Sequence, residues 1–330
     1  MFHRLSHAVL LAVAFLFTTA VEAAPVRVGV SDWPGWVAWY VAKEKGFFKK
    51  YDADVELVWF PNYTDSIQAL SAGQLDANSQ TWGDTMAPLA AGVPLKIILA
   101  NDNSAGNDAL MVAPSITGFA DLKGKSIALE QYSVSHFVLA TALAHNGMTP
   151  ADVQVVNLAA GDAAAAFLGG RVPAVVVWNP WVNQIQSSGK GKALFTSKDM
   201  PGLIPDLLVA RGPALADAKK RAIFVGMVRA WYDTVAFIGA HPREAAVIMA
   251  KVVGLPPEEY ATYLPGTRFF GAQENLIALG EPQRPESLVG VGPTIAAFLT
   301  ENKLLEGKVD FAAAVDASLV REVAAKPSAD

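Results

Sequence analysis

The sequence predicts an α/β protein built from two compact lobes, and three observations support this fold class. Two separate stretches, 26–100 and 125–195, each alternate between short apolar segments of strand character and helical segments. Such alternation is typical of a mostly parallel sheet covered by helices. The third observation is the length, because 330 residues exceed the ~100 to 200 residues that usually form one core.

The first stretch begins with a βαβ unit around which we expect the chain to be organised. An apolar strand over 26–31 reaches a turn at Pro34 and Gly35, and these residues end the strand pattern. A helix over 36–45 and a strand over 54–60 are expected to follow. The further elements expected in this stretch are a helix over 64–72, a strand over 75–79, a helix over 84–91 and a strand over 95–100.

A polar segment, NDNSAGN at 101–107, separates the two stretches and is expected to form a loop before a strand over 108–113. The elements expected in the second stretch are strands over 125–130, 153–158, 174–178 and 192–195 and helices over 134–146, 161–169 and 181–187. One more strand is expected over 206–210. The rest of the chain is expected to be mostly helical, with long helices over 213–239 and 242–253.

The first 23 residues have the pattern of a secretory signal peptide. Arg4 precedes an apolar run from Ala8 to Ala20, and the small residues that follow predict cleavage near Ala23. A membrane anchor is the less favoured interpretation, since the run is shorter than the ~20 residues of a spanning helix. Without a cysteine to carry a lipid, the exported chain is expected to diffuse freely, most simply in a Gram-negative periplasm.

Composition excludes several classes of function. A formal net charge of −5 without a basic patch argues against nucleic-acid binding. The absence of cysteine excludes disulfides, thiolate metal sites and a cysteine nucleophile. The few histidines have no spacing typical of metal ligands, so we expect no metal, and no motif indicates a cofactor. We also expect the protein to be a monomer.

Most tryptophans fall where a ligand is expected to bind. In open parallel sheets, ligands lie beyond the carboxyl ends of the strands. Five of the eight tryptophans are in loops at such positions: Trp33, Trp36, Trp82, Trp178 and Trp181. Because exposed loops normally lack such large rings, we expect something to cover them. The other three, Trp39, Trp59 and Trp231, lie inside apolar elements and are expected to be core residues.

The same loops carry acids and no Lys or Arg. Their acids are Asp32, Asp84, Asp102, Glu130 and Asp162, and Asp206 follows at a later strand. A buried anion is usually bound by basic side chains or helix N-termini, so these loops favour a cationic or neutral ligand held by aromatic rings. Because a helix N-terminus can bind an anion, the helices expected after residues 35, 83 and 133 leave a small anion as an alternative ligand. Asp32 and Asp162 have a second interpretation as helix caps.

The order of several segments resembles the solute-binding proteins of ABC importers of the taurine, nitrate and sulfonate type, whose fold is shared with thiamine-precursor-binding proteins. These segments are VRVGVSDWPGWVAWYVAKEKGFF, DVELVWF, SIQALSAGQLDA, GVPLKIIL, DLKGKSIAL and AAFLGGRVPAVVVWNPW. The opening SDWPGW is similar to a subgroup encoded near urea- or guanidine-consuming enzymes. The family's usual Gly before Ser133 is Tyr132 here, which puts in doubt an anion held by backbone amides at that point.

The resemblance implies a two-lobed periplasmic-binding-protein fold (type II) with a two-strand hinge. Lobe I would hold 25–110 and 211–330, and lobe II would hold 111–210. Ligand in the cleft would contact both lobes and favour the closed form. The implied function is capture of a small solute and its delivery to an ABC permease of the inner membrane, without catalysis.

Combining the loops with the resemblance, we expect a small nitrogen-containing cationic or neutral solute. The predicted ligand-binding residues are Asp32, Trp33, Trp36, Trp82, Asp84, Glu130, Tyr132, Ser133, Trp178 and Asp206. Ser133 is also expected to cap the following helix. An oxyanion such as an alkanesulfonate, taurine or nitrate is the alternative ligand. A pyrimidine-precursor-related enzyme on the same fold is the less favoured alternative function.

Overall fold

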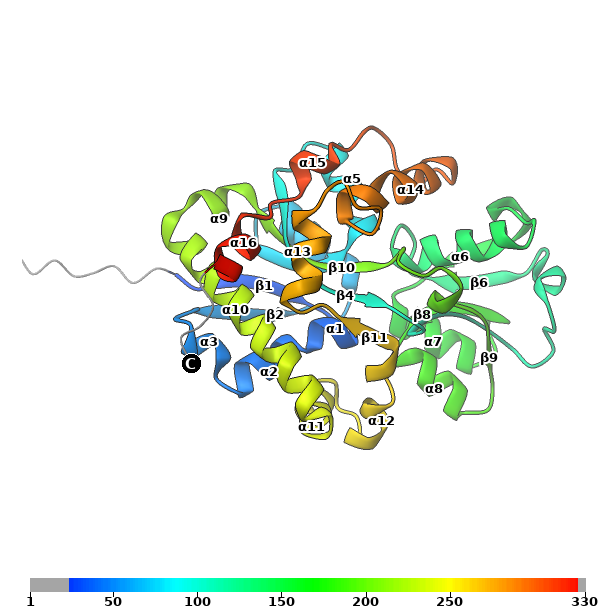
Figure 1. The fold of residues 1–330 in the computed structure, drawn as a ribbon. Helices are drawn as coiled ribbons and strands as arrows, with labels where there is room; N and C mark the ends of the chain where they lie inside the picture. Colours follow the sequence, from blue (N-terminus) through cyan, green and yellow to red (C-terminus); the bar gives the residue numbers. More distant parts are fainter. Residues whose placement is uncertain (1–23, 326–330) are drawn as a thin grey trace, which may run out of the picture.

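The computed structural model describes residues 24–325 and contains two sheets, each flanked by helices (Figure 1). The six-stranded sheet has the order β11-β4-β10-β3-β1-β2, and the five-stranded sheet has the order β7-β6-β8-β5-β9. Most strands of each sheet run parallel. The exceptions are β10 and β11 in the first sheet and β5 in the second. The predicted α/β fold class with two mostly parallel sheets is confirmed.

The elements follow the predicted alternation closely. The strands are β1 (Val26–Val30), β2 (Val55–Trp59), β3 (Ala77–Thr81), β4 (Leu95–Ser104), β5 (Asp108–Val112), β6 (Ser126–Leu129), β7 (Gln154–Asn157), β8 (Ala174–Trp178), β9 (Lys192–Thr196), β10 (Pro205–Arg211) and β11 (Thr267–Phe269). The helices are α1 (Pro34–Val37), α2 (Trp39–Glu44), α3 (Phe47–Lys50), α4 (Tyr63–Ser71), α5 (Trp82–Ala90), α6 (Val134–His145), α7 (Ala160–Leu168), α8 (Trp181–Ser187), α9 (Gly212–Ala216), α10 (Ala218–Ala240), α11 (Pro242–Val253), α12 (Pro257–Ala261), α13 (Ala272–Gly280), α14 (Leu288–Glu301), α15 (Phe311–Ala314) and α16 (Ser318–Ala325). The short 3-10 helices are η1 (Phe119–Leu122), η2 (Pro150–Asp152), η3 (Ser197–Asp199) and η4 (Leu264–Gly266).

Local chemistry explains where several helices begin. The Thr81 side chain accepts the backbone N–H of Asp84 at 3.1 Å and so caps α5. The predicted cap of α6 is confirmed, because the Ser133 hydroxyl accepts the N–H of Ser135 at 3.2 Å. The Asp217 carboxylate caps α10, and the helix predicted over 213–239 is therefore two helices, α9 and α10, on either side of this cap.

The predicted polar loop over 101–107 is wrong in its first half. Strand β4 continues to Ser104, and Asn101 to Ser104 are buried. They stay in the sheet because β10 and β11 pair with β4 on its two sides and satisfy its backbone groups. This extension carries Asp102 into the interior.

The chain crosses between the two sheets at 105–107, from β4 to β5, and at 197–204, from β9 to β10. The crossings pack on each other at Gly106, whose φ of 125° is a conformation that favours glycine. A Cβ at Gly106 would lie 2.7 Å from Cε of Lys198. A side chain at this position would strain the backbone and displace the Lys198 side chain.

Sheet membership divides the chain slightly differently from the predicted lobe boundaries. Residues 108–110 pair in the five-stranded sheet, and 205–210 pair in the six-stranded sheet, whereas the sequence placed them the other way round. Below, lobe I is 24–104 with 205–325, and lobe II is 108–196. The assignment of the lobes as separate domains stays a prediction, and the predicted signal peptide at 1–23 lies outside the described residues.

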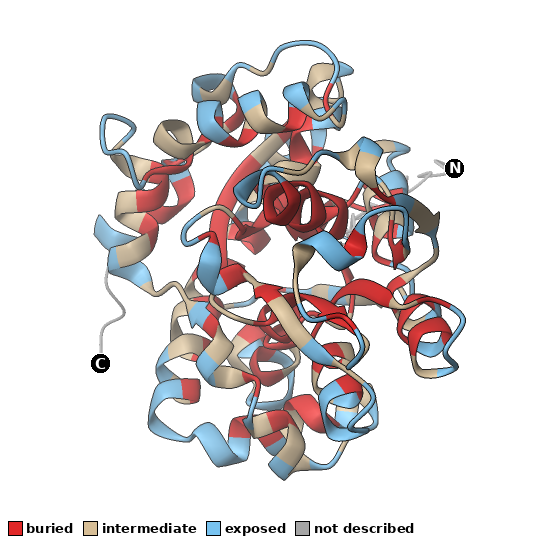
Figure 2. Ribbon diagram, turned by 90° about the vertical axis from the view of Figure 1, so that its right-hand side faces the viewer, coloured by how far each residue is buried: buried red, intermediate tan, exposed pale blue. Residues whose placement is uncertain are grey.

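Buried residues gather along the strands at the centre of each lobe (Figure 2). The predicted core residues Trp39 and Trp231 are fully buried in lobe I, with ring centroids 4.6 Å apart. Trp59 differs, since it is 36% exposed at the edge strand β2. Among residues 24–325, α10 alone is long and apolar enough to cross a membrane. Half of its most apolar window is buried in the fold, as in the core helix of a globular domain.

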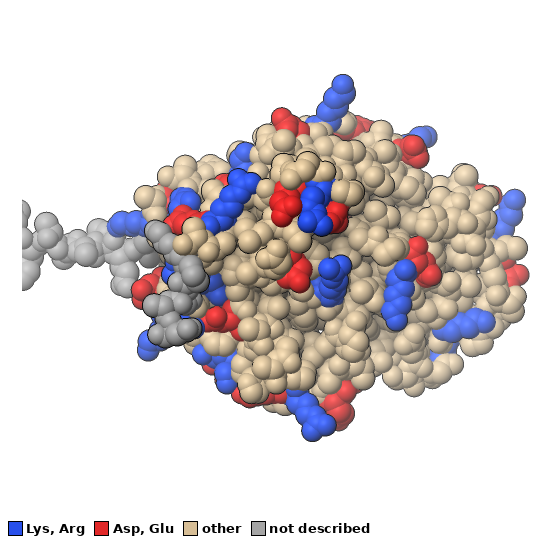
Figure 3. All heavy atoms as spheres, viewed as in Figure 1, with Lys and Arg blue, Asp and Glu red and all other residues tan. Residues whose placement is uncertain are grey.

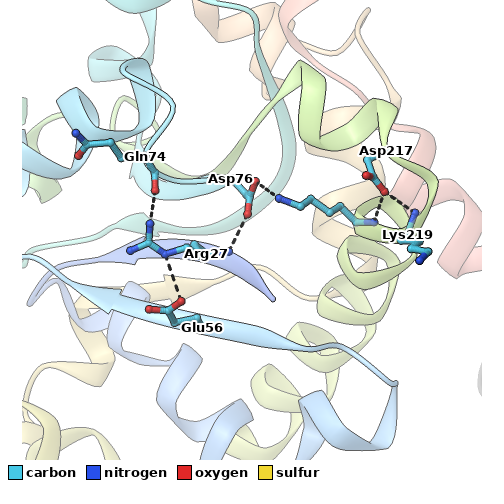
Figure 4. A network of polar contacts seen from close by, with 7 residues as sticks. Arg27, Glu56, Gln74, Asp76, Asp217 and Lys219 are labelled. Carbon is cyan, nitrogen blue, oxygen red and sulfur yellow. Dashed lines mark hydrogen bonds and ion pairs between the residues drawn. The ribbon is translucent and has the colours of Figure 1, made fainter. Parts of the chain in front are cut away.

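Ion pairs and hydrogen bonds join charged side chains at the surface of the molecule. On the face in Figure 3, basic and acidic residues are interspersed. Figure 4 shows a network near the amino ends of β1 and β2, where Arg27 pairs with Glu56 at 3.2 Å and donates to Gln74. The Asp76 carboxylate accepts the Arg27 N–H and pairs with Lys220 of α10 at 2.7 Å. This network fastens α10 to the sheet at the end opposite to the candidate site.

Candidate ligand-binding site between the lobes

A small cavity lies where the carboxyl-end loops of the two sheets meet. Its volume is about 10 Å³, which is room for about one water molecule. Its lining residues are Trp33, Trp36, Tyr63, Thr81, Asp108, Val134, Trp178, Ile204 and Asp206. All nine are buried, and they come from both lobes and from the second crossing. The structure is therefore a closed form in which the lobes cover the cavity.

Four aromatic rings form much of the cavity wall. The ring centroids of Trp33 and Trp36 are 6.5 Å apart, those of Trp36 and Tyr63 are 4.8 Å apart, and those of Tyr63 and Trp178 are 6.0 Å apart. Hydrogen bonds fix three of the rings. Trp33 Nε1 donates to Asp102 at 3.0 Å, the Tyr63 hydroxyl donates to a carboxylate of lobe I, and Trp178 Nε1 donates across the lobes. Trp36 Nε1 is buried without a partner, which leaves one indole donor available.

Two carboxyl groups, those of Asp108 and Asp206, face the cavity without a compensating base. In each, the buried Oδ2 receives no hydrogen bond from an N–H or hydroxyl group of the described residues, and no lining residue is Lys, Arg or His. Burial raises the pKa of Asp108 to about 7. Burial, with the nearby carboxyls of Asp102 and Asp108, raises the pKa of Asp206 well above its ordinary value.

Asp102 lies next to the pair formed by Asp108 and Asp206, and it does not line the cavity. It faces Asp206 across the β4–β10 ladder, and the two carboxyls are within hydrogen-bonding reach of each other. Burial raises the pKa of Asp102 too. Ionising all three carboxyls costs much free energy, because no cation lies beside them. A ligand that supplies positive charge or N–H donors would lower this cost. Within residues 24–325, no three His, Asp or Glu side chains are grouped so as to hold a metal ion.

Three further acids join the two lobes directly. Asp32 accepts Nε1–H of Trp178 at 2.7 Å and of Trp181 at 2.9 Å. Asp84 of α5 accepts the N–H of Val134 in α6 at 3.1 Å and the Tyr63 hydroxyl at 2.8 Å. Desolvation raises the pKa of Asp32 to about 6 and that of Asp84 to about 7.

Glu130 forms the third junction. One of its oxygens accepts both the N–H of Thr64, at 2.9 Å, and the Thr64 hydroxyl, at 2.7 Å. Burial raises the pKa of Glu130 above its ordinary value. Asp32, Asp84 and Glu130 are thus engaged by the opposite lobe, and none of them lines the cavity.

The structure places four of the predicted ligand-binding residues at the cavity wall: Trp33, Trp36, Trp178 and Asp206. The predicted residues that lie elsewhere are Asp32, Asp84 and Glu130 at the lobe junction, Ser133 at the cap of α6, Trp82 in the core of lobe I, and Tyr132 at the surface. Trp82 donates to the carbonyl of Leu288 and packs on Phe311. Tyr132 is 67% exposed with a φ of 63°.

Five lining residues were not predicted: Tyr63, Thr81, Asp108, Val134 and Ile204. Tyr63 follows β2, a strand whose carboxyl-end loop carried no tryptophan or acid to draw attention. Asp108 begins its strand, but β5 runs antiparallel to β8, so its amino end meets the carboxyl end of β8 at Trp178. Asp108 could have been found from the sequence by recognising that β5 runs antiparallel to the other strands of its sheet.

Two α/β lobes that close over an aromatic cavity are the arrangement expected of a solute-binding protein. More particularly, the chain belongs to the NMT1/THI5 like family, whose model matches residues 33–245. The resemblance to the solute-binding proteins of ABC importers is thereby confirmed. The urea and guanidine subgroup stays a prediction.

Individual relatives agree with this assignment. A protein of Escherichia coli (strain K12), provisionally named as an aliphatic sulfonates-binding protein, is 27% identical over 301 residues, which is 89% of this chain and 90% of the relative. The taurine-binding periplasmic protein of the same organism is 30% identical over 144 residues, 44% of this chain and 45% of the relative. The alkanesulfonate-binding protein SsuA from Xanthomonas axonopodis pv. citri, solved bound to MOPS, shares the fold with a TM-score of 0.74 at 20% identity, covering 91% of this chain and all of SsuA.

Proposed function

We propose that this protein is the periplasmic solute-binding component of an ABC importer and that it captures a small nitrogen-containing solute, cationic or neutral and rich in N–H donors. It releases this solute to a permease of the inner membrane and does not transform it. Membership of the family and the names of the relatives support the importer role. Export would depend on residues 1–23, and we propose that the exported protein acts as a monomer.

The observation that carries the ligand class is the pair of buried cavity acids, Asp108 and Asp206, inside an aromatic wall that has no base. A flat cation such as guanidinium would donate N–H groups to both carboxylates. Its charge would also be attracted to the ring faces, by roughly 0.5 to 2 kcal/mol per well-placed ring. In this closed form the cavity volume is about 10 Å³, far below the ~300 to 1,000 Å³ of drug-sized pockets. A solute of few heavy atoms is therefore favoured, and the lobes would part slightly to admit it.

From the sequence, helix N-termini could have bound an anion. In the structure, backbone N–H groups at these N-termini already donate to acceptors within the protein. The first amide of α6, at Val134, donates to Asp84, and the next donates to Ser133. In α5, the N–H of Asp84 donates to Thr81. At α1, the Asp102 carboxylate packs so closely that a Cβ on Gly35 would lie 1.8 Å from its oxygen. An oxyanion would have to displace these groups, whereas a cation would not.

An oxyanion is the second candidate, and the names of the relatives favour it over a cation. Those names refer to aliphatic sulfonates and taurine, and the first of these relatives aligns over 89% of this chain. An anion in this cavity would need Asp108 and Asp206 protonated, because two ionised carboxylates would repel it. Its affinity would accordingly rise as the pH falls.

Calorimetric titration of the protein from residue 24 onward tests the proposal. Guanidinium, urea, tetramethylammonium and an aminopyrimidine should be compared with taurine, ethanesulfonate and nitrate at pH 8. Binding within the first group, with the compound recovered unchanged, is the expected result. Binding of taurine or nitrate while the whole first group fails would replace the cation proposal with the oxyanion one, and turnover of a bound compound would contradict the transport role.

A further inference from the structure

We propose that the two lobes cap each other's helices across the cleft, so that Glu130 and Asp84 act as positioning residues that set the equilibrium between open and closed forms without touching the ligand. The inference concerns closure and does not depend on which solute the cavity takes. It assigns to these two acids a role different from the ligand contact expected from the sequence.

Helix α4 of lobe I shows the first half of the exchange. The residue at its N-cap, Asn62, accepts no backbone N–H of the helix, and its side-chain amide donates to Asp65. Instead, the N–H and the hydroxyl of Thr64 both donate to Glu130, which follows β6 of lobe II. The first N–H groups of a helix have no partner within it, and its N-terminus favours negative charge. The Glu130 carboxylate of lobe II therefore acts as an N-cap for α4 of lobe I.

Helix α6 of lobe II shows the reciprocal half. The hydroxyl of its own cap, Ser133, accepts the N–H of Ser135 but not the N–H of Val134. The N–H of Val134 donates to Asp84, which lies in the first turn of α5 in lobe I. Each lobe thus supplies one carboxylate to the N-terminus of a helix in the other.

Further contacts reinforce the same junction. The Asp32 carboxylate of lobe I holds two indole N–H groups of lobe II. The rings of Phe137 in α6 and Phe298 in α14 meet edge to face with centroids 5.3 Å apart. The side-chain amide of Asn183 donates to Glu259 at 3.1 Å. Because these contacts join protein to protein, they close the cleft without any contribution from a ligand.

The caps exist only in the closed form, since opening returns both carboxylates and both helix ends to water. Removing a helix cap changes an equilibrium by roughly 2- to 30-fold. A Glu130→Ala variant should therefore lower the ratio of closed to open protein by that factor. When ligand binds only the closed form, the apparent affinity falls by up to the same factor.

A matched control is available in the same chain. Asp217 caps α10 within lobe I by accepting the N–H groups of Lys219 and Lys220, at 2.8 and 3.1 Å. An Asp217→Ala variant also removes a carboxylate cap, but from a helix that does not meet lobe II at its N-terminus. It should lower the melting temperature and leave the ratio of closed to open protein unchanged. A Glu130→Gln variant keeps an oxygen acceptor for Thr64 and should fall between wild type and Glu130→Ala.

The natural sequence has no cysteine, so one engineered cysteine in each lobe can be labelled selectively. Ser115→Cys in lobe II and Glu306→Cys in lobe I are exposed positions for a pair of dyes. Single-molecule energy transfer in ligand-free protein then counts closed and open molecules. We expect a closed fraction in wild type, a 2- to 30-fold lower closed-to-open ratio in Glu130→Ala and a wild-type ratio in Asp217→Ala.

Two results would overturn the inference. One is a ratio in Glu130→Ala equal to that of wild type, with circular dichroism showing a folded protein. The other is a ligand-free wild type with no detectable closed fraction. Since no ligand is added, both results are separate from any failure of the proposed ligand class.

Discussion

Replacing Asp206 by asparagine is the substitution whose effect follows most directly from the cavity. Asp206 is 1% exposed and lines the cavity, and no N–H or hydroxyl group of the described residues donates to its Oδ2. A hydrogen bond to a charged group contributes about 1.5 to 3 kcal/mol, and each ~1.4 kcal/mol is tenfold in affinity. Asp206→Asn should therefore weaken binding of a cationic ligand by roughly 10- to 150-fold.

The same change should make the ligand-free protein more stable at pH 8. It removes a carboxyl that is buried beside Asp102 and Asp108, whose charges disfavour its ionisation. Calorimetry measures the affinity, and thermal unfolding measures the stability. Asp162→Asn is the control, because Asp162 is an exposed acid in the first turn of α7 and outside the cavity. An affinity of Asp206→Asn within threefold of wild type would refute the reasoning.

Three further predictions concern the cavity ring, the surface and the pH. Trp36→Leu keeps an apolar side chain but removes a ring, and should weaken binding of a cation by roughly 2- to 30-fold in the same titration. Tyr132→Gly relieves a left-handed backbone at an exposed residue and should raise the free energy of unfolding by up to about 1 kcal/mol without changing affinity, as chemical denaturation can measure. The ligand-free protein should lose melting temperature as the pH rises from 5 to 8. Burial raises the pKa values of Asp108 and Asp84 to about 7. The folded state therefore binds more protons than the unfolded state over this range, and stability falls as the pH rises. A flat melting temperature between these pH values would contradict the buried, unpaired carboxyls.

The fold could be predicted from the sequence because its signals are local. Alternating strands and helices, glycines at helix ends, and a chain too long for one core each act over a few residues or over length alone. Strand β8, for example, reads AVVVW and is buried throughout, as expected of a strand covered on both faces. The polar end of β4 was missed since its burial depends on pairing with β10 and β11, which come more than 100 residues later.

The candidate site could be predicted only as a region. The rule that ligands meet the carboxyl ends of strands identified the loops of Trp33, Trp36 and Trp178, which do line the cavity. It did not identify Asp108, because Asp108 and Asp206 lie at the amino ends of β5 and β10, which run antiparallel to their neighbours. It also could not show that Asp84 and Glu130 contact the opposite lobe, since that depends on how the two lobes meet.

The central claim is that buried carboxylates, with no base among them, receive a cation. The most direct measurement is the affinity of the best-binding solute at pH 6 and at pH 8. With the pKa of Asp108 at about 7 and that of Asp206 raised by burial, a cation must displace protons at pH 6. The affinity for a cation should rise toward pH 8, by up to about tenfold per pH unit for each proton displaced. An affinity that falls over the same range would contradict it, since that is the behaviour of an anion bound to protonated acids.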